Sequence, residues 1–284
     1  MTYAHNGDCE IWYETFGSAS NPTLVLVNGL GSQCINYPIG WCEKFAARDL
    51  QVIRLDNRDV GLSTKFESHS VDETGACYRL SDMAADVIAV LDAVNVDRAH
   101  VMGLSMGGMI VQTMAIERPE RLLTMTSVMS NTGEPGIGIG TQQAIAQLTA
   151  PPATDRESYV KAWIDGLHVW GSPEFADEER WRANAESAFD RCFHPSGPGR
   201  QYMAVGASGS RADQLRVVTV PTLVIHGSCD TLITSDGGRR TAELIPGARF
   251  ELIDGMGHDY PPQLWDMWVE MVADHAARHF PSAI

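Results

Sequence analysis

The feature that most constrains the fold of this chain is a pentapeptide that joins an expected strand to an expected helix. The apolar run Ala99–Gly103 leads directly into Gly103-Leu104-Ser105-Met106-Gly107, and a helical pattern covers Met106–Arg118. A chain that passes from strand to helix within so few residues must bend sharply. Small glycines on either side allow the central serine to adopt a strained backbone. The sequence therefore predicts a turn that holds the Ser105 hydroxyl out from the edge of a sheet.

Strand-like and helical segments alternate over residues 8–130, and the pattern resumes near the C-terminus. The expected strands are Cys9–Thr15, Thr23–Val27, Gln51–Leu55, Ala99–Gly103, Leu122–Met129, Thr222–Ile225 and Arg249–Ile253. The expected helices are Ile39–Arg48, Leu80–Val94, Met106–Arg118, Asp236–Ile245 and Pro262–His279. Such alternation predicts the α/β class, with a mostly parallel, doubly wound sheet that carries helices on both faces.

Residues 131–216 have a different character. A glycine-rich stretch at 133–140 cannot form a regular element for long, and a break rich in proline and glycine is expected at 195–199. Between them, helical patterns rich in aromatic residues cover Thr141–Thr149, Arg156–Trp170 and Pro173–Phe193. We expect residues 131–216 to form an inserted helical cap, or lid, over a core made of residues 1–130 and 217–284. Most of the aromatic side chains should pack the cap on the core, and a minority should face an apolar cavity.

Charge and composition exclude several classes of protein. The formal net charge is −15, from 21 Lys and Arg against 36 Asp and Glu, which argues against binding to nucleic acid or to anionic membranes. No run of about 18 apolar residues is present, so no membrane span is expected. The first eight residues lack the basic segment and apolar core of a signal peptide, and six scattered cysteines fit reduced thiols. The expected location is the cytoplasm.

A serine hydroxyl becomes a good nucleophile only when a base removes its proton, and that base needs an orienting acid. Asp230 follows the expected strand Thr222–Ile225, and His258 lies just after Arg249–Ile253. In a parallel sheet, both loops emerge at the carboxyl edge of the strands, as does Ser105. The chain order serine, aspartate, histidine is that of hydrolases built around this elbow. We therefore expect Ser105, His258 and Asp230 to form a catalytic triad.

Other titratable residues compete for these roles. Asp254 and Asp259 are sequence neighbours of His258 and cannot readily bend back to the far nitrogen of its ring. The other histidines lie at a turn after a strand, within the insertion, or on the solvated face expected for the final helix: His226, His168, His194, His275 and His279.

Backbone N–H groups must stabilise the oxyanion of the tetrahedral intermediate. One donor should be the amide of Met106, which follows the serine. The other should come from the loop Asn28-Gly29-Leu30-Gly31-Ser32, with Leu30 as the expected donor. An ordinary tight glycine turn explains this loop when it is considered alone. Its place beside a serine elbow in the same sheet favours the oxyanion role.

These stretches resemble the α/β-hydrolase family over nearly the whole chain. The resemblance rests on residues 28–31, 56–63, 103–107, 220–230 and 255–258. It is greatest to the esterase and lipase branch that includes aclacinomycin methylesterase, and it implies the Ser105–Asp230–His258 triad, donors from Leu30 and Met106, and a helical cap. Two positions depart from the family pattern. Asn28 stands where many relatives carry histidine, and Asp59 stands where many carry glycine.

The expected activity is hydrolysis of carboxylic esters, with a small-molecule apolar substrate of small or medium acyl group. No cofactor and no metal are expected, because the chain lacks a metal motif such as His-Glu-x-x-His and a phosphate-binding glycine loop. The serine at the elbow argues against haloalkane dehalogenases and epoxide hydrolases, which in this fold use aspartate. Thioesterase, lactonase, perhydrolase and carbon–carbon hydrolase activities stay open, as do a ligand receptor with slow turnover and assembly into a homo-oligomer.

Overall fold

The computed structural model describes residues 2–67 and 69–280. Its centre is an eight-stranded sheet in the order β1-β2-β4-β3-β5-β6-β7-β8. The strands are β1 (Tyr3–Asn6), β2 (Cys9–Phe16), β3 (Thr23–Val27), β4 (Gln51–Leu55), β5 (Ala99–Leu104), β6 (Leu122–Val128), β7 (Thr222–Gly227) and β8 (Arg249–Ile253). β2 pairs antiparallel with β1 and β4, and the other neighbours pair in parallel.

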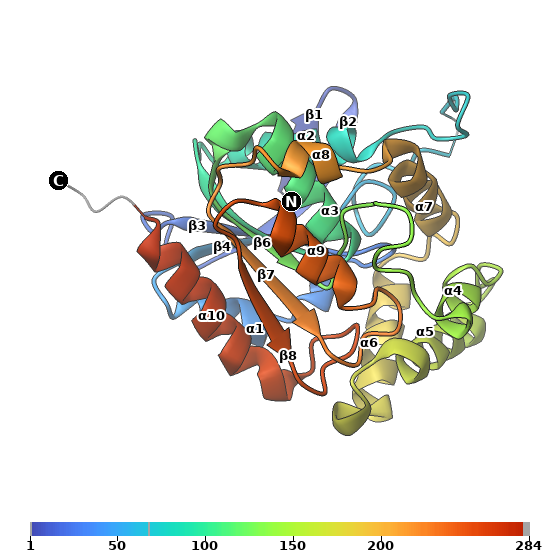
Figure 1. Ribbon diagram of the computed structural model, residues 1–284. Coiled ribbons are helices and arrows are strands. Elements are labelled where there is room, and N and C mark those ends of the chain that lie inside the picture. The colour runs from blue at the N-terminus through green and yellow to red at the C-terminus, as the bar shows by residue number, and fades with distance from the viewer. Residues whose placement is uncertain (1, 68, 281–284) are drawn as a thin grey trace.

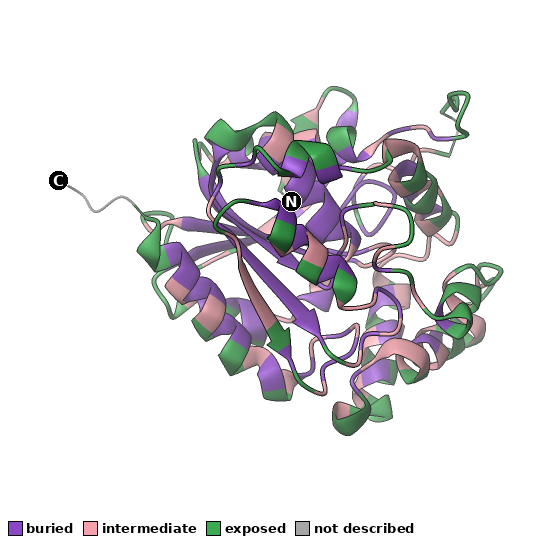
Figure 2. Ribbon diagram, in the orientation of Figure 1, coloured by how far each residue is buried: buried purple, intermediate pink, exposed green. Residues whose placement is uncertain are grey.

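Helices cover both faces of the sheet (Figure 1). One face carries α2 (Leu80–Ala93), α3 (Met106–Glu117) and α9 (Asp236–Leu244), and the other carries α1 (Ile39–Ala46) and α10 (Trp265–Arg278). Figure 2 shows the strands at the centre of the molecule as buried and the outer sides of the helices as exposed. The predicted doubly wound, mostly parallel α/β sheet is confirmed.

The central strands are buried at every position, as in β3, β5 and β6. Most of their residues are apolar, because a parallel strand covered by helices on both faces has no side that meets water. Parallel pairing also brings the carboxyl ends of β3, β5, β7 and β8 to one edge of the sheet. The segments that follow these strands carry every predicted site residue.

Between β6 and β7 lies what we call the helical segment, residues 131–216. Its helices are α4 (Gln142–Leu148), α5 (Arg156–Trp170), α6 (Glu178–Arg191), α7 (Gly197–Ser208) and α8 (Ala212–Leu215). α5 and α6 pack together around buried Val160, Ile164 and Trp181. In Figure 1 the arrowheads of β7 and β8 point toward α5 and α6. The short 3-10 helices of the fold are η1 (Cys34–Asn36), η2 (Pro119–Arg121), η3 (Pro173–Phe175) and η4 (Pro262–Leu264).

Three expectations for the helices are wrong in detail. The expected break at 195–199 contains the start of α7, because Pro198 lies in the first turn, where proline costs no hydrogen bond. The expected helix Pro173–Phe193 is divided into η3 and α6, whose N-cap Asp177 accepts a hydrogen bond from the Arg180 amide. His275 is buried rather than solvated, since α10 turns this residue toward the sheet.

Candidate active site

Ser105 lies between β5 and α3 in the left-handed region of backbone conformation, with φ +55° and ψ −117°. Such a conformation costs a non-glycine residue about 1–3 kcal/mol. The flanking glycines are required for close packing. A Cβ on Gly103 would lie 2.1 Å from the Gly107 carbonyl oxygen, and one on Gly107 would lie 2.1 Å from the Val27 oxygen. The chain therefore makes the sharp, strained turn that the pentapeptide predicts.

The structure brings Asp230 and His258 into contact from the loops after β7 and β8. His258 Nδ1 lies 2.7 Å from Asp230 Oδ2. The other carboxylate oxygen, Oδ1, accepts hydrogen bonds from the amides of Leu232 and Ile233, each at 2.9 Å. The Asp230 side chain is fully buried and the His258 side chain is 8% exposed. Each oxygen of the carboxylate is therefore held in a fixed direction.

The charge on Asp230 fixes the state of the neighbouring imidazole. Burial alone would raise the pKa of Asp230, but His258 and His226 outweigh burial and lower it to about 2. Asp230 is therefore ionised at neutral pH and accepts the proton on Nδ1 of His258. This hydrogen bond selects the tautomer whose Nε2 lone pair is free to accept a proton.

A second imidazole contacts the same carboxylate. His226 Nε2 lies 2.8 Å from the Ile233 carbonyl oxygen and 3.3 Å from Asp230 Oδ2. Because a carbonyl only accepts hydrogen bonds, Nε2 of His226 carries a proton. The ring is completely buried and fits because residue 238 is glycine, whose added Cβ would lie 2.4 Å from His226 Nδ1. We predicted only a structural turn for His226, although its position four residues before Asp230 was a usable signal.

The loop after β3 packs directly against the elbow. A Cβ on Gly29 would lie 3.2 Å from Ser105 Cβ and 3.8 Å from Ser105 Oγ. The amide of Gly31 donates to Gln201 Oε1 at 2.8 Å, and the amide of Ser32 donates to the Gly29 oxygen. Leu30 lies between these anchored residues, and Met106 provides the first amide of α3, which has no acceptor within the helix. Both predicted oxyanion donors thus belong to segments that adjoin Ser105.

Hydrogen bonds that the sequence did not predict join this loop to the helical segment. Gln201, on α7, also donates to the Arg58 carbonyl oxygen at 2.8 Å and is completely buried. Gln33 Nε2 donates to the carbonyl oxygens of Ala188 at 2.7 Å and Cys192 at 2.9 Å. Asn28, one of the departures from the family pattern, donates its side-chain amide to the Gln33 oxygen at 2.8 Å. The unusual asparagine therefore closes the loop on itself.

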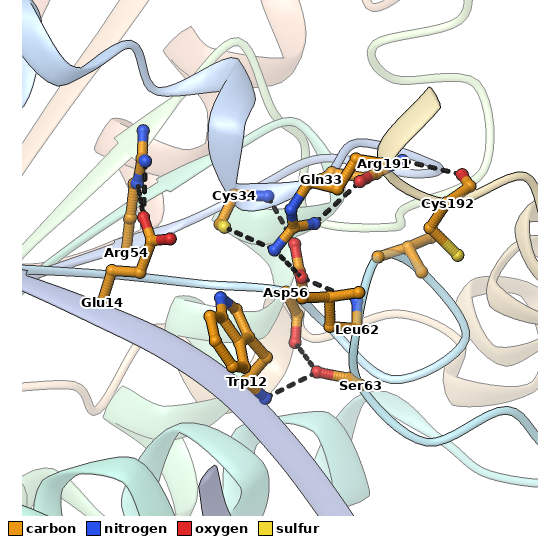
Figure 3. Close-up of polar contacts among 12 residues, drawn as sticks. Trp12, Glu14, Gln33, Cys34, Arg54, Asp56, Leu62, Ser63, Arg191 and Cys192 are labelled. Carbon is orange, nitrogen blue, oxygen red and sulfur yellow. Dashed lines mark hydrogen bonds and ion pairs between the residues drawn. The ribbon is translucent and has the colours of Figure 1, made fainter. Parts of the chain in front are cut away.

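The end of α6 is tied to the same region by a buried ion pair (Figure 3). Arg191 lies 2.7 Å from Asp56 Oδ2, and it donates to Gln33 Oε1 at 2.7 Å and Cys34 Sγ at 3.4 Å. The fully buried Asp56 also accepts hydrogen bonds from the amides of Cys34 and Leu62. The charge of Asp56 is thus neutralised by a residue more than 100 positions away in the chain.

Asp59, the second departure from the family pattern, forms another link to the helical segment. Its backbone is in the left-handed region, at φ +72°, where glycine is favoured. Its carboxylate accepts two hydrogen bonds from Arg200, at 2.9 and 2.7 Å, and one from the Tyr78 hydroxyl at 2.6 Å. The strain is offset by this bidentate pair with α7.

The competing acids contact serines instead of the His258 ring. Asp254 Oδ1 accepts a hydrogen bond from the Ser228 hydroxyl at 2.9 Å. Asp259 Oδ1 accepts one from the Ser172 amide at 2.9 Å. Asp230 is therefore the carboxylate in contact with His258.

Metal sites and membrane spans can be assessed for the described part of the chain. Within residues 2–67 and 69–280, no group of three or more His, Cys, Asp or Glu side chains is arranged to hold a metal ion. In the same part of the chain, no helix combines the length and the apolar character that a bilayer span requires. All six cysteines lie in this part of the chain and are free thiols.

Comparison with known proteins decides the family. Residues 18–261 match the family described as serine aminopeptidase, S33. The chain belongs to the S33 family of α/β hydrolases.

Similarity to known relatives shows which branch of the family this S33 hydrolase belongs to. It is 31% identical to rhodomycin D methylesterase DnrP of Streptomyces peucetius, over 90% of this chain and 91% of the relative. It is 24% identical to carboxylesterase YbfK of Bacillus subtilis, over 85% of this chain and 76% of the relative. The meta-cleavage product hydrolase of Pseudomonas fluorescens IP01 superposes with a TM-score of 0.80 at 18% identity, over 98% of both chains, which shows the shared fold. This S33 hydrolase is a carboxylic-ester hydrolase of the esterase branch.

Proposed function

We propose that the protein hydrolyses apolar carboxylic esters through a serine acyl-enzyme. Ser105 is the nucleophile, His258 is the base, and the carboxylate of Asp230 orients the base. The observation that carries this proposal is the 2.7 Å contact between His258 Nδ1 and the ionised, buried Asp230. The strained turn at Ser105 supports it, because it presents the hydroxyl at the same edge of the sheet.

In the first half of the reaction, Ser105 Oγ attacks the ester carbonyl carbon while His258 Nε2 takes the serine proton. The carbonyl oxygen becomes an oxyanion, which the amides of Leu30 and Met106 stabilise. When the tetrahedral intermediate collapses, the bond to the alcohol oxygen breaks and His258 returns its proton to that alcohol.

In the second half, a water molecule attacks the acyl-enzyme while His258 again acts as base. Collapse of the second intermediate releases the carboxylic acid and restores the Ser105 hydroxyl. Asp230 keeps its charge throughout and stabilises the imidazolium that forms in each half.

We further infer that residues 131–216 act as a cap over a core of residues 1–130 and 217–284. The contacts of Gln201 with Gly31, of Arg191 with Asp56, and of Gln33 with the Ala188 carbonyl oxygen join this segment to the loops of the core and support this division. The cap would then supply the apolar surface that receives the acyl group. Similarity to a methylesterase favours esters of a small alcohol, so methyl esters of apolar acids are the first substrates to test.

The test compares the wild-type protein with Ser105→Ala on p-nitrophenyl acetate, p-nitrophenyl butyrate and methyl esters of graded acyl size. Hydrolysis should fall by at least a thousandfold in the variant, with the thermal unfolding temperature unchanged or raised because alanine removes no core contact. Full activity in the variant would refute the proposal. Parallel assays with a thioester, a lactone and a β-diketone separate the other serine-dependent reactions. Tight binding with negligible turnover of every compound would favour a receptor.

A further inference from the structure

The turn Val169–Ser172, at the end of α5, contacts both loops that carry the proposed acid and base. Thr231 is the residue after Asp230, and its hydroxyl donates a hydrogen bond to the Val169 carbonyl oxygen at 2.7 Å. The backbone amide of His258 itself donates to the Trp170 carbonyl oxygen at 2.6 Å. One short stretch of the helical segment is thus bonded to the loops after β7 and β8.

Ser172 and Asp259 close this contact with a buried chain of hydrogen bonds. The Gly257 amide donates to Ser172 Oγ at 2.8 Å, and the Ser172 hydroxyl in turn donates to Asp259 Oδ1. The Ser172 amide donates to the same oxygen at 2.9 Å. Ser172 is completely buried and Asp259 is 6% exposed. The residues on both sides of His258 are therefore bonded to one serine of the helical segment.

The His258 loop and the turn Val169–Ser172 are closely packed against each other. A Cβ on Gly257 would lie 2.3 Å from the carbonyl carbon of Gly171 and 2.5 Å from the Trp170 oxygen. The His258 loop and the turn after α5 are in direct backbone contact. A displacement of this turn would therefore displace the His258 backbone with it.

We propose that Ser172 and Asp259 are positioning residues for the reaction, which hold the His258 imidazole at its working place through the turn Val169–Ser172. This inference rests on the role proposed above for His258. It assigns to the helical segment a second task besides covering the substrate. An enzyme loses about a hundredfold in rate when a reacting group is misplaced by about 1 Å, so loss of this anchor should be visible in kcat.

The chain contains a matched control between the loops after β7 and β8. The Ser228 hydroxyl donates to Asp254 Oδ1 at 2.9 Å and accepts a hydrogen bond from the Gly255 amide at 2.9 Å. The bonding pattern is that of Ser172, Asp259 and Gly257. Ser228 and Asp254 are exposed, however, and both belong to the loops themselves rather than to the helical segment.

The experiment measures kcat and KM for Ser172→Ala, Asp259→Ala, Asp259→Asn, Ser228→Ala and Asp254→Ala. Each variant is assayed with the small ester p-nitrophenyl acetate and with a bulky aryl ester. Ser172→Ala and Asp259→Ala should lower kcat ten- to a hundredfold by the same factor on both esters, with KM within threefold of wild type. The two control variants should stay within threefold. Asp259→Asn keeps an oxygen acceptor for Ser172 and should recover most of the kcat lost in Asp259→Ala.

Three results would overturn the inference: a rise in KM for the bulky ester alone, losses no larger than those of the control variants, or an Asp259→Asn variant as impaired as Asp259→Ala. If Ser172→Ala does not fold, the comparison of the two Asp259 variants decides. If both alanine variants fail to fold, hydrogen exchange in Asp259→Asn decides, since the amides of Gly257 and His258 should be protected there as in wild type. Ser105→Ala is assayed in parallel. Full activity in that variant refutes the proposed function, whereas its inactivity together with normal kcat in Ser172→Ala refutes only the inference about positioning.

Discussion

His226, near the end of β7, and His258, in the loop after β8, both contact Oδ2 of Asp230, at 3.3 and 2.7 Å. His226 is bound to its place by the Ile233 carbonyl and is completely buried. One carboxylate oxygen therefore has a fixed imidazole on one side and the proposed base on the other.

Replacement of Asp230 by asparagine should reduce kcat by about 10³–10⁴-fold. The asparagine amide can donate to Nδ1 of His258, which selects the wrong tautomer and leaves no lone pair on Nε2. Asp254→Asn removes a neighbouring carboxylate outside the site and should leave kcat within threefold. Steady-state kinetics on p-nitrophenyl butyrate measure kcat for both variants. A decrease in kcat of less than tenfold in Asp230→Asn would contradict the role assigned to this residue.

The low pKa of Asp230 also makes a prediction about pH. Because this pKa is lowered to about 2, the carboxylate stays charged as the pH falls from 8 to 4. Its contribution to folding is present above the unfolded pKa near 4 and is lost only as the pH falls toward 2. Replacing Asp230 by asparagine should therefore reduce the loss of unfolding free energy between pH 4 and pH 2. Urea denaturation at several pH values measures this, and an equal loss in the variant and the wild type over that range would count against an ionised Asp230.

Gln201 should matter for the proposed oxyanion site, although it lies on α7. Gln201→Ala leaves the Gly31 amide without its acceptor and frees the loop that contains Leu30. We expect kcat/KM to fall about tenfold or more, and the inhibition constant of a trifluoromethyl ketone to rise by the same factor, because such a compound imitates the tetrahedral intermediate. Gln214→Ala is the control variant, because Gln214 is an exposed glutamine on α8. Weaker hydrolysis without weaker inhibition would exclude an effect on the oxyanion site.

Much of the fold could be predicted from the sequence because the central strands are buried on both faces. The bounds of β3 and β4, which are buried at every position, match the predicted ones. Those of the edge strand β8 also match, and there Arg249 and Glu251 alternate with Phe250 and Leu252. β1 was missed because Tyr3–Asn6 is short and half polar. The start of α7 was missed because Pro198 and Gly199 resemble a break unless the proline is placed in the first turn of a helix.

For the candidate site too, one part could be predicted from the sequence and another could not. Asp230 and His258 could be predicted because each follows a strand of one parallel sheet, so topology alone brings them to the same edge. The bonds between Ser172 and Asp259, 87 residues apart, and between Gly31 and Gln201, 170 residues apart, depend on how the helical segment is seated on the core. No periodicity in the sequence reports that arrangement.

The ion pair between Arg191 and Asp56 should be important for stability. Arg191→Ala leaves a fully buried carboxylate without its countercharge, which costs about 3 kcal/mol. Arg156→Ala breaks an exposed ion pair between α5 and Asp190 of α6, and it should change the stability little. Urea denaturation of both variants provides the comparison. Equal effects would show that the buried pair contributes no more than the surface one.

Two buried histidines should make the protein sensitive to acid. Burial and neighbouring histidines lower the pKa of His100 to about 4. For His275, burial and the nearby cationic groups of His279, Arg249 and Arg278 outweigh the hydrogen bond to Pro221, and its pKa is also about 4. The unfolded chain binds these protons near pH 6.5, so stability is full above that pH and falls as the pH decreases toward 4, by roughly 3 kcal/mol for each histidine.

Denaturation at pH 7 and pH 5 measures this loss. His100→Gln and His275→Gln should each reduce the difference in unfolding free energy between the two pH values, whatever their effect at pH 7. His69→Gln replaces an exposed histidine and should leave the difference unchanged. An undiminished difference in both buried variants would show that other groups cause the sensitivity.

The most direct test of the account is the site at which a fluorophosphonate reacts. Intact-mass and peptide mass spectrometry should find one adduct per chain, on Ser105, with labelling at least a thousandfold slower in His258→Ala. Labelling at another residue, or equally fast labelling of Ser105 without the imidazole of His258, would contradict the triad on which the account depends.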